Sequence, residues 1–171
     1  MDASFAVHPD FRSHTGATMT MEDGAITSIS CKQGMNTRTS TEAEVVAADK
    51  VIGPMLSTSQ FLRAQGYPLQ KNILFQDNRS AMLLETNGRT SAGKCSCHLN
   101  IRYFFVADQQ QKGQLHIEYC PTDQMIGDYM TMPLHGKKFT EFRKLIMNLP
   151  QAAHLIMAAY VVDPGSGQKT G

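Results

Sequence analysis

The sequence predicts an α/β fold with a mixed sheet, and three observations lead to that prediction. The chain has 171 residues, 42% of them hydrophobic, which is enough to bury the core of one domain. A hairpin pattern near the start indicates two antiparallel strands. After the hairpin, periodic segments follow in the order helix, strand, helix, helix, strand, helix, and such an alternation is typical of α/β folds.

The hairpin is expected at residues 17–30, ATMTMEDGAITSIS. Threonines alternate with apolar residues at its start, as in a strand with one buried face. Asp23-Gly24 then supplies a turn whose backbone requires positive φ. The segment therefore predicts two paired strands.

A helix is expected from Thr41 to Gly66, because apolar residues recur there at steps of three and four. Pro54 lies inside this segment and should kink the helix or divide it in two. Thr41 and Glu44 form a capping box, in which both side chains bind amides at the helix start. Capping alone accounts for Glu44, and a ligand role is the alternative.

The second half of the chain predicts shorter elements. KNILFQD, at residues 71–77, has the composition of a strand, and NRSAMLLETNG after it predicts a short helix ending at Gly88. Residues 89–97 are polar and contain glycine, so we expect a loop. The remaining predicted elements are a helix over residues 101–108, a strand at 114–120, a helix that begins at Thr122 and carries Asp128, and an amphipathic helix at 137–149.

Charge and hydropathy limit the classes of function. The formal net charge of +1 gives no global field for a polyanion, so a nucleic-acid contact would depend on the local placement of Lys and Arg. The longest apolar run, residues 152–162, is shorter than the roughly 20 residues that a bilayer requires. We therefore expect no membrane partner.

The four cysteines are too few for a disulfide scaffold. They fit reduced thiols and predict a cytoplasmic protein, with the nucleus as the alternative location. A zinc site is left open, although C-x-C-H lacks the paired spacing of known structural sites. Its ligands would be Cys95, Cys97, His98 and Cys120.

Four acidic residues stand at junctions between predicted elements, where open α/β sheets place their ligand sites. They are Asp2, Glu44, Asp77 and Asp128. Carboxylate oxygens suit Mg²⁺, and two ions about 4 Å apart would activate water and stabilise the leaving oxygen in phosphodiester hydrolysis. Each acid also has a structural explanation, with Glu44 and Asp77 as helix caps, Asp128 as a solvated helix charge and Asp2 as a terminal residue.

Five blocks resemble, in order and spacing, the ribonuclease H domain that ends the polyprotein of copia-type LTR retrotransposons. They are DASFAVHPDFRSHTGATMTM, TSTEAEVVAADK, QDNRSAMLLETNGR, CHLNIRYFFVAD and IEYCPTDQMIGDYMTMPL. The resemblance implies a ribonuclease H-like domain over residues 1–149, with a five-stranded mixed sheet flanked by helices and a first strand truncated at Met1. Residues 150–171 would form a C-terminal extension, partly helical and then flexible.

The resemblance also implies metal-dependent cleavage of the RNA strand of RNA/DNA hybrids during reverse transcription. The four acids would be catalytic and would bind two Mg²⁺ ions, for which Mn²⁺ could substitute. Glu44 would bind metal from the N3 position of its helix, and Glu42 would be an exposed charge. The reverse transcriptase domain of the parent polyprotein would be the protein partner. Six further residues are expected either to contact the hybrid or to serve only as turn and helix-cap residues. They are Thr39, Ser40, Thr41, Asn78, Arg79 and His98.

Three positions depart from the family's usual residues: Arg79 stands in place of Gln, Gly127 in place of Ala and Met132 in place of Lys. Gly127 is expected inside a helix, where it would cost about 1 kcal/mol against Ala. The alternative function is therefore a catalytically inactive remnant that at most binds nucleic acid or associates with a reverse transcriptase. An integrase core is disfavoured, because STEAE and QDN resemble the ribonuclease H blocks.

Overall fold

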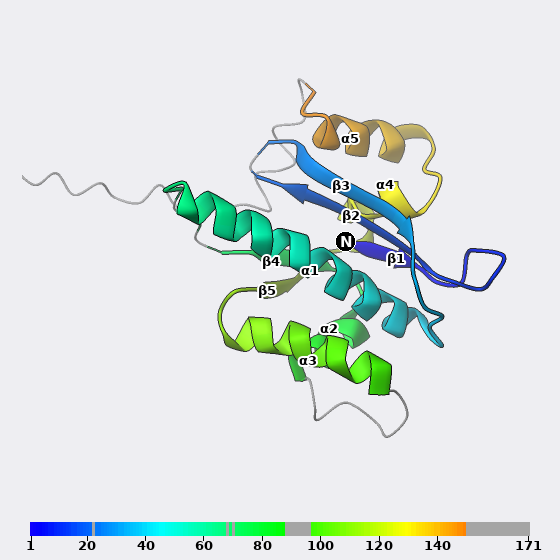
Figure 1. The fold of residues 1–171 in the computed structure, drawn as a ribbon. Coiled ribbons are helices and arrows are strands. Elements are labelled where there is room, and N and C mark those ends of the chain that lie inside the picture. Colours follow the sequence, from blue (N-terminus) through cyan, green and yellow to red (C-terminus); the bar gives the residue numbers. More distant parts are fainter. Residues whose placement is uncertain (22, 68, 70, 88–96, 150–171) are drawn as a thin grey trace, which may run out of the picture.

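The computed structural model describes residues 1–21, 23–67, 69, 71–87 and 97–149, with the backbone alone for residues 87, 97–101 and 103. The C-terminal segment 150–171 lies outside the described residues, as does the predicted loop at 89–97 except for its last residue. In the described part of the chain, strands and helices alternate after an initial hairpin (Figure 1). This order confirms the predicted α/β class.

The first sheet is antiparallel, with the strand order β1-β2-β3. Its strands are β1 (Asp2–Ser4), β2 (His14–Thr20) and β3 (Ala25–Lys32). Gly24 lies between β2 and β3 with φ +73°, a conformation that glycine adopts without a steric penalty. The predicted hairpin is therefore confirmed, and it is longer than predicted because pairing continues to His14 and Lys32.

The second sheet consists of two parallel strands, β4 (Ile73–Gln76) and β5 (His116–Tyr119). It adjoins β1, since the Met1 amino group donates a hydrogen bond to the Phe75 carbonyl oxygen at 3.1 Å. The Ala3 amide donates to the side chain of Glu44 and not to β4. The described residues thus form a three-stranded antiparallel sheet and a parallel pair, where the resemblance implied one five-stranded mixed sheet.

Helices cover both faces of the first sheet (Figure 1). Ala17 of β2 belongs to the apolar cluster that it shares with α1 (Ser40–Ala64). A Cβ atom on the preceding residue, Gly16, would meet the side chain of Thr131 in α4 (Asp128–Thr131) at 2.5 Å. Because neighbouring strand residues point to opposite faces, α1 and α4 lie on opposite sides of the sheet.

The remaining helices pack around this core. Helices α2 and α3 contact each other and α1, and α5 contacts α4. Their bounds are Arg79–Asn87 for α2, Cys97–Gln111 for α3 and Gly136–Ile146 for α5. Within the described residues, every helix is too short or too polar to cross a bilayer.

Helix α1 is continuous, so Pro54 does not divide it; division was one of the two predicted outcomes, the other being a kink. Pro54 is exposed, and water can therefore solvate the carbonyl group that loses its hydrogen-bond partner. Gly53 precedes it and, having no Cβ atom, avoids the clash that disfavours helical backbone before proline. The Gly-Pro order explains why the helix passes through this position.

The segment after β5 also differs from the prediction of one helix beginning at Thr122. It starts with a short 3₁₀ turn, η2 (Thr122–Gln124), and α4 begins only at Asp128. Gly127 precedes α4 and does not lie inside a helix. A Cβ atom on Gly127 would meet the backbone nitrogen of Asp2 at 2.7 Å, so the close approach of β1 interrupts the predicted helix.

Candidate metal centre

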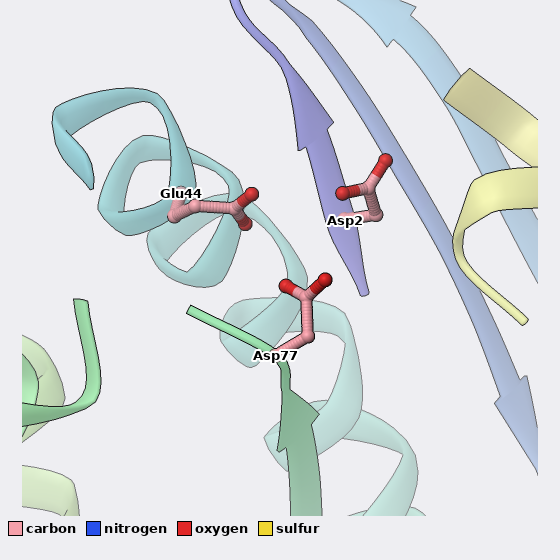
Figure 2. Close-up of side chains that lie close together, drawn as sticks. All are labelled: Asp2, Glu44 and Asp77. Atoms are coloured by element: carbon pink, nitrogen blue, oxygen red, sulfur yellow. The ribbon is translucent and has the colours of Figure 1, made fainter. Parts of the chain in front are cut away.

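Three of the four predicted acids meet at one place. Asp2 comes from β1, Glu44 from the second turn of α1 and Asp77 from the residue that follows β4. Each offers one oxygen atom, and these atoms all lie within 4.8 Å of one another. Figure 2 shows the three side chains pointing toward one another from their separate elements. The fold therefore gathers carboxylates from distant parts of the sequence.

The two glutamates at the start of α1 have different roles. Thr39 is the N-cap residue, and its hydroxyl group accepts a hydrogen bond from the Glu42 amide at 3.1 Å. The Glu42 carboxylate in turn accepts one from the Arg38 amide at 2.7 Å. The predicted capping box of Thr41 and Glu44 is therefore wrong, because the cap lies two residues earlier. Glu44 lies beyond the N3 position, and its side chain is 4% exposed.

Glu44 accepts hydrogen bonds on both carboxylate oxygens. The Ala3 amide donates to Oε1 at 3.2 Å, and the Gln76 side-chain amide donates to Oε2 at 3.5 Å. Burial and, to a smaller extent, the negative charges of Asp2 and Asp77 together raise the pKa of Glu44 to about 8. Ionising Glu44 is therefore costly unless a cation compensates the three charges.

Asp2 is buried under α4, where the Thr131 hydroxyl group donates a hydrogen bond to its carboxylate. Burial raises the pKa of Asp2, the hydrogen bond from Thr131 opposes this rise, and the charges of Asp128 and Asp77 add to it. Asp2 is thus a second crowded carboxyl group. Its orientation depends on the packing of α4 against β1.

Asp77 is half-buried and accepts a hydrogen bond from the Thr122 hydroxyl group at 2.9 Å. It does not cap α2. That role belongs to Asn78, whose side-chain oxygen accepts hydrogen bonds from the Ser80 and Ala81 amides at 3.0 and 3.1 Å. The structural alternative for Asp77 is therefore wrong, and its carboxylate is left to face Asp2 and Glu44.

Gln76 is fully buried and contacts two of the three acids, a role that its residue type alone does not indicate. Its side-chain oxygen accepts hydrogen bonds from the Asp77 amide at 3.0 Å and the Asn78 amide at 3.1 Å. Its side-chain nitrogen donates to Glu44. Gln76 therefore orients both Glu44 and the backbone of Asp77. Its position next to Asp77 in the QDN block was the available signal.

The donor set fits one divalent cation. Oxygen atoms on opposite sides of a Mg²⁺ ion lie roughly 4 Å apart, since each Mg–O bond is about 2.1 Å long. Separations within 4.8 Å are compatible with that value. Among the described residues, the ion pairs do not include Asp2, Glu44 or Asp77, and the nearby Met1 amino group only partly offsets the rise in the pKa of Asp2 and Glu44. A divalent site is therefore consistent with these side chains.

Asp128 is not part of this group. It begins α4 and is 2% exposed, and its carboxylate forms an ion pair with Lys138 of α5 at 2.7 Å. The prediction placed all four acids around two ions, but the described residues gather three around one position. The Asp128 carboxylate is instead paired with a lysine, so the described residues bring three of the four predicted acids together.

The residues predicted to contact a hybrid lie close to Glu44 or Asp77 in the sequence, apart from His98, whose side chain is outside the described residues. Thr39 and Ser40 are exposed and Thr41 is half-buried at the start of α1. The Arg79 guanidinium group lies 4.7 Å from the centre of the Tyr119 ring, and Asn78 is engaged as a helix cap. The zinc site that the sequence left open lies largely outside the described residues, since Cys95 and the side chains of Cys97 and His98 are not described.

Comparison with known proteins links the chain to transposons. It is similar to the retrovirus-related Pol polyprotein from transposon TNT 1-94 of Nicotiana tabacum, with 27% identity over 146 residues. The aligned region covers 85% of this chain and only 11% of that polyprotein. No family model and no solved structure matches the chain. The sequence is therefore similar to one segment of a retrotransposon Pol polyprotein, as the five blocks predicted.

Proposed function

We propose that the chain is a metal-dependent endonuclease of the ribonuclease H type, which cleaves the RNA strand of RNA/DNA hybrids. The observation that carries this proposal is the convergence of Asp2, Glu44 and Asp77, with oxygen atoms within 4.8 Å of one another. The similarity to a segment of a retrotransposon polyprotein favours a role in reverse transcription. The ribonuclease H-like domain would span residues 1–149.

The carboxylates of Asp2, Glu44 and Asp77 would hold the cation, and Mg²⁺ suits such hard oxygen ligands. When bound, the ion would activate a water molecule and stabilise charge on the phosphodiester. Gln76 orients Glu44, and Thr122 holds the carboxylate of Asp77. Since Asp2 and Glu44 are buried and Asp77 is half-buried, substrate would approach from the side of Asp77.

The residues beside these acids suit a nucleic-acid backbone. Thr39 and Ser40 are exposed just before Glu44, and Arg79 follows Asp77 by two residues. A hybrid is chosen by the shape of its minor groove and by the 2′-hydroxyl groups of one strand, so small polar groups suffice without a large basic surface. The reverse transcriptase domain of the same polyprotein would be the partner, in the cytoplasm.

A catalytically inactive remnant that binds nucleic acid is the second candidate. One observation favours it: Asp128, which the resemblance places among the catalytic acids, is paired with Lys138 at 2.7 Å. In that case hybrids would be bound but would stay intact.

The test is cleavage of a hybrid with a labelled RNA strand in Mg²⁺ by the wild-type chain and by Asp77→Asn. We expect the variant to lose activity by about 100-fold or more, because charge stabilisation at the reacting phosphate is lost. Asp108→Asn is the matched control, since Asp108 lies in a surface ion pair with Lys112, and it should cleave like wild type. Intact hybrids in both Mg²⁺ and Mn²⁺ would overturn the nuclease proposal, and binding in a gel shift would then support the remnant.

A further inference from the structure

Lys138 is held at a defined position beside the acidic centre. Its ammonium nitrogen lies 2.7 Å from the Asp128 carboxylate and 3.1 Å from the Thr122 carbonyl oxygen. The Phe142 ring lies 5.2 Å from the same nitrogen. Lys138 is in the first turn of α5, where the helix dipole disfavours a positive charge, so these contacts compensate an otherwise unfavourable placement.

Two threonines connect this ion pair to two of the three converging acids. Thr122 accepts from Lys138 through its backbone and donates to Asp77 through its hydroxyl group at 2.9 Å. Thr131, one turn after Asp128 in α4, donates to Asp2. A single threonine therefore lies between the ion pair and each of two proposed metal ligands, Asp77 and Asp2.

We propose that the Lys138 ammonium group takes the place of a second divalent cation, so that the centre holds one ion bound by Asp2, Glu44 and Asp77. This inference rests on the proposed metal-dependent function and specifies its stoichiometry. A divalent ion on Asp128 would have to displace an ammonium group from a carboxylate that is 2% exposed. Breaking a buried ion pair leaves an uncompensated charge, which opposes such a displacement.

The test counts the Mn²⁺ ions that the full chain binds at saturation, by calorimetric titration and by electron paramagnetic resonance of the free ion. The wild-type chain should bind one ion. Lys138→Met keeps the aliphatic stem, removes the charge and should bind two. Lys137→Met is the matched control: Lys137 is the neighbouring residue, its side chain is 90% exposed and it pairs with Glu141, so this variant should still bind one ion.

A second variant tests the same inference in the opposite direction. Asp128→Asn should keep one ion with wild-type affinity, because Asp128 does not bind metal. An affinity loss of about tenfold or more would identify Asp128 as a ligand or its close support and would overturn the inference. This variant decides the question if circular dichroism shows that Lys138→Met does not fold.

The outcomes separate the inference from the function on which it rests. Two ions in the wild-type chain, or one ion in folded Lys138→Met, would overturn the role of Lys138 and leave the nuclease proposal standing. A wild-type chain that binds no Mn²⁺ would overturn the metal-dependent function itself.

Discussion

Glu85 of α2 is a buried acid that the proposed chemistry does not use. Its side chain is 0% exposed, and within the described residues neither carboxylate oxygen has a hydrogen-bond partner of good geometry. Burial raises the pKa of Glu85 to about 7, and the nearby amide of Gln76 opposes only part of this rise. The folded chain therefore keeps a proton on Glu85 at a pH at which a solvated glutamate would have lost it.

Glu85→Gln should remove a pH-dependent loss of stability. Folding raises the pKa of this carboxyl group, so its full stabilising contribution is present only when the pH is below the pKa of the unfolded chain. The contribution is lost as the pH rises through about 7, the pKa in the folded chain. As the pH is raised from about 4 to about 8, the unfolding free energy of the variant minus that of wild type should increase by on the order of 3 kcal/mol. Urea unfolding at both pH values measures the difference. The exposed Glu118, as Glu118→Gln, should show no gain, and an equal result for both variants would contradict the prediction.

Residues of the centre differ in how far sequence alone can predict them. Asp2, Glu44 and Asp77 stand beside elements with clear periodicity, and the five-block resemblance groups them, so their meeting could be predicted. The only signal for Gln76 is its place next to Asp77 in the QDN block. Lys138 could not be singled out, because its role arises from contacts between segments far apart in the chain. Propensity rules also cannot decide which of two nearby glutamates caps a helix.

The short helix α4 depends on two glycines that let backbones approach closely. A Cβ atom on Gly16 would lie 2.8 Å from the Gly127 carbonyl oxygen, and one on Gly127 would lie 2.7 Å from the Asp2 backbone nitrogen. Helix propensity predicts that alanine at position 127 would be favourable, but propensity describes an isolated helix. The tertiary contact with β1 reverses the expected sign.

Gly127→Ala should therefore destabilise the fold by about 1–3 kcal/mol, as overpacking does, where propensity alone predicts a gain of about 1 kcal/mol. The variant should also bind Mn²⁺ more weakly, because the clash falls on the backbone and Cβ atom of Asp2. Chemical denaturation and Mn²⁺ titration measure the two effects. Gly34→Ala is the matched control, since a Cβ atom there would meet nothing within 4 Å and should leave both quantities unchanged. A stabilised Gly127→Ala would show that propensity dominates.

Across the whole molecule, the element order could be predicted, but the way in which the strands join could not. Periodicity and the hairpin turn place four of the five strands, and β1 was implied only by the resemblance. The division into two sheets depends on single hydrogen bonds at β1, which periodicity does not encode. The centre lies at this division. It joins Asp2 of the first sheet, Asp77 after the second sheet and Glu44 of α1.

Metal should therefore link these parts and change the pH dependence of stability. Without metal, Glu44 contributes fully to the stability of the fold below about pH 4.5, because its pKa is raised by folding. This contribution to stability is lost as the pH rises through about 8. Mg²⁺ or Mn²⁺ needs the ionised carboxylate, so its stabilising effect should grow over the same range, reaching about 2.7 kcal/mol at a concentration of 100 times Kd. The melting temperature at about pH 6 and pH 8, in EDTA and in metal, measures this, with K⁺ at equal ionic strength as the control.

The variant Glu44→Gln distinguishes two roles for Glu44, that of a metal ligand and that of an acid kept only for its structural hydrogen bonds. If Glu44 is held in place to bind a cation, the neutral amide removes repulsion from Asp2 and Asp77, and the variant should melt at a higher temperature than wild type in EDTA at about pH 8. It should also lose the stabilisation by metal. A glutamate kept only for the hydrogen bonds that it accepts from Ala3 and Gln76 would give the opposite pair of results, because losing an acceptor lowers the melting temperature whether or not metal is present.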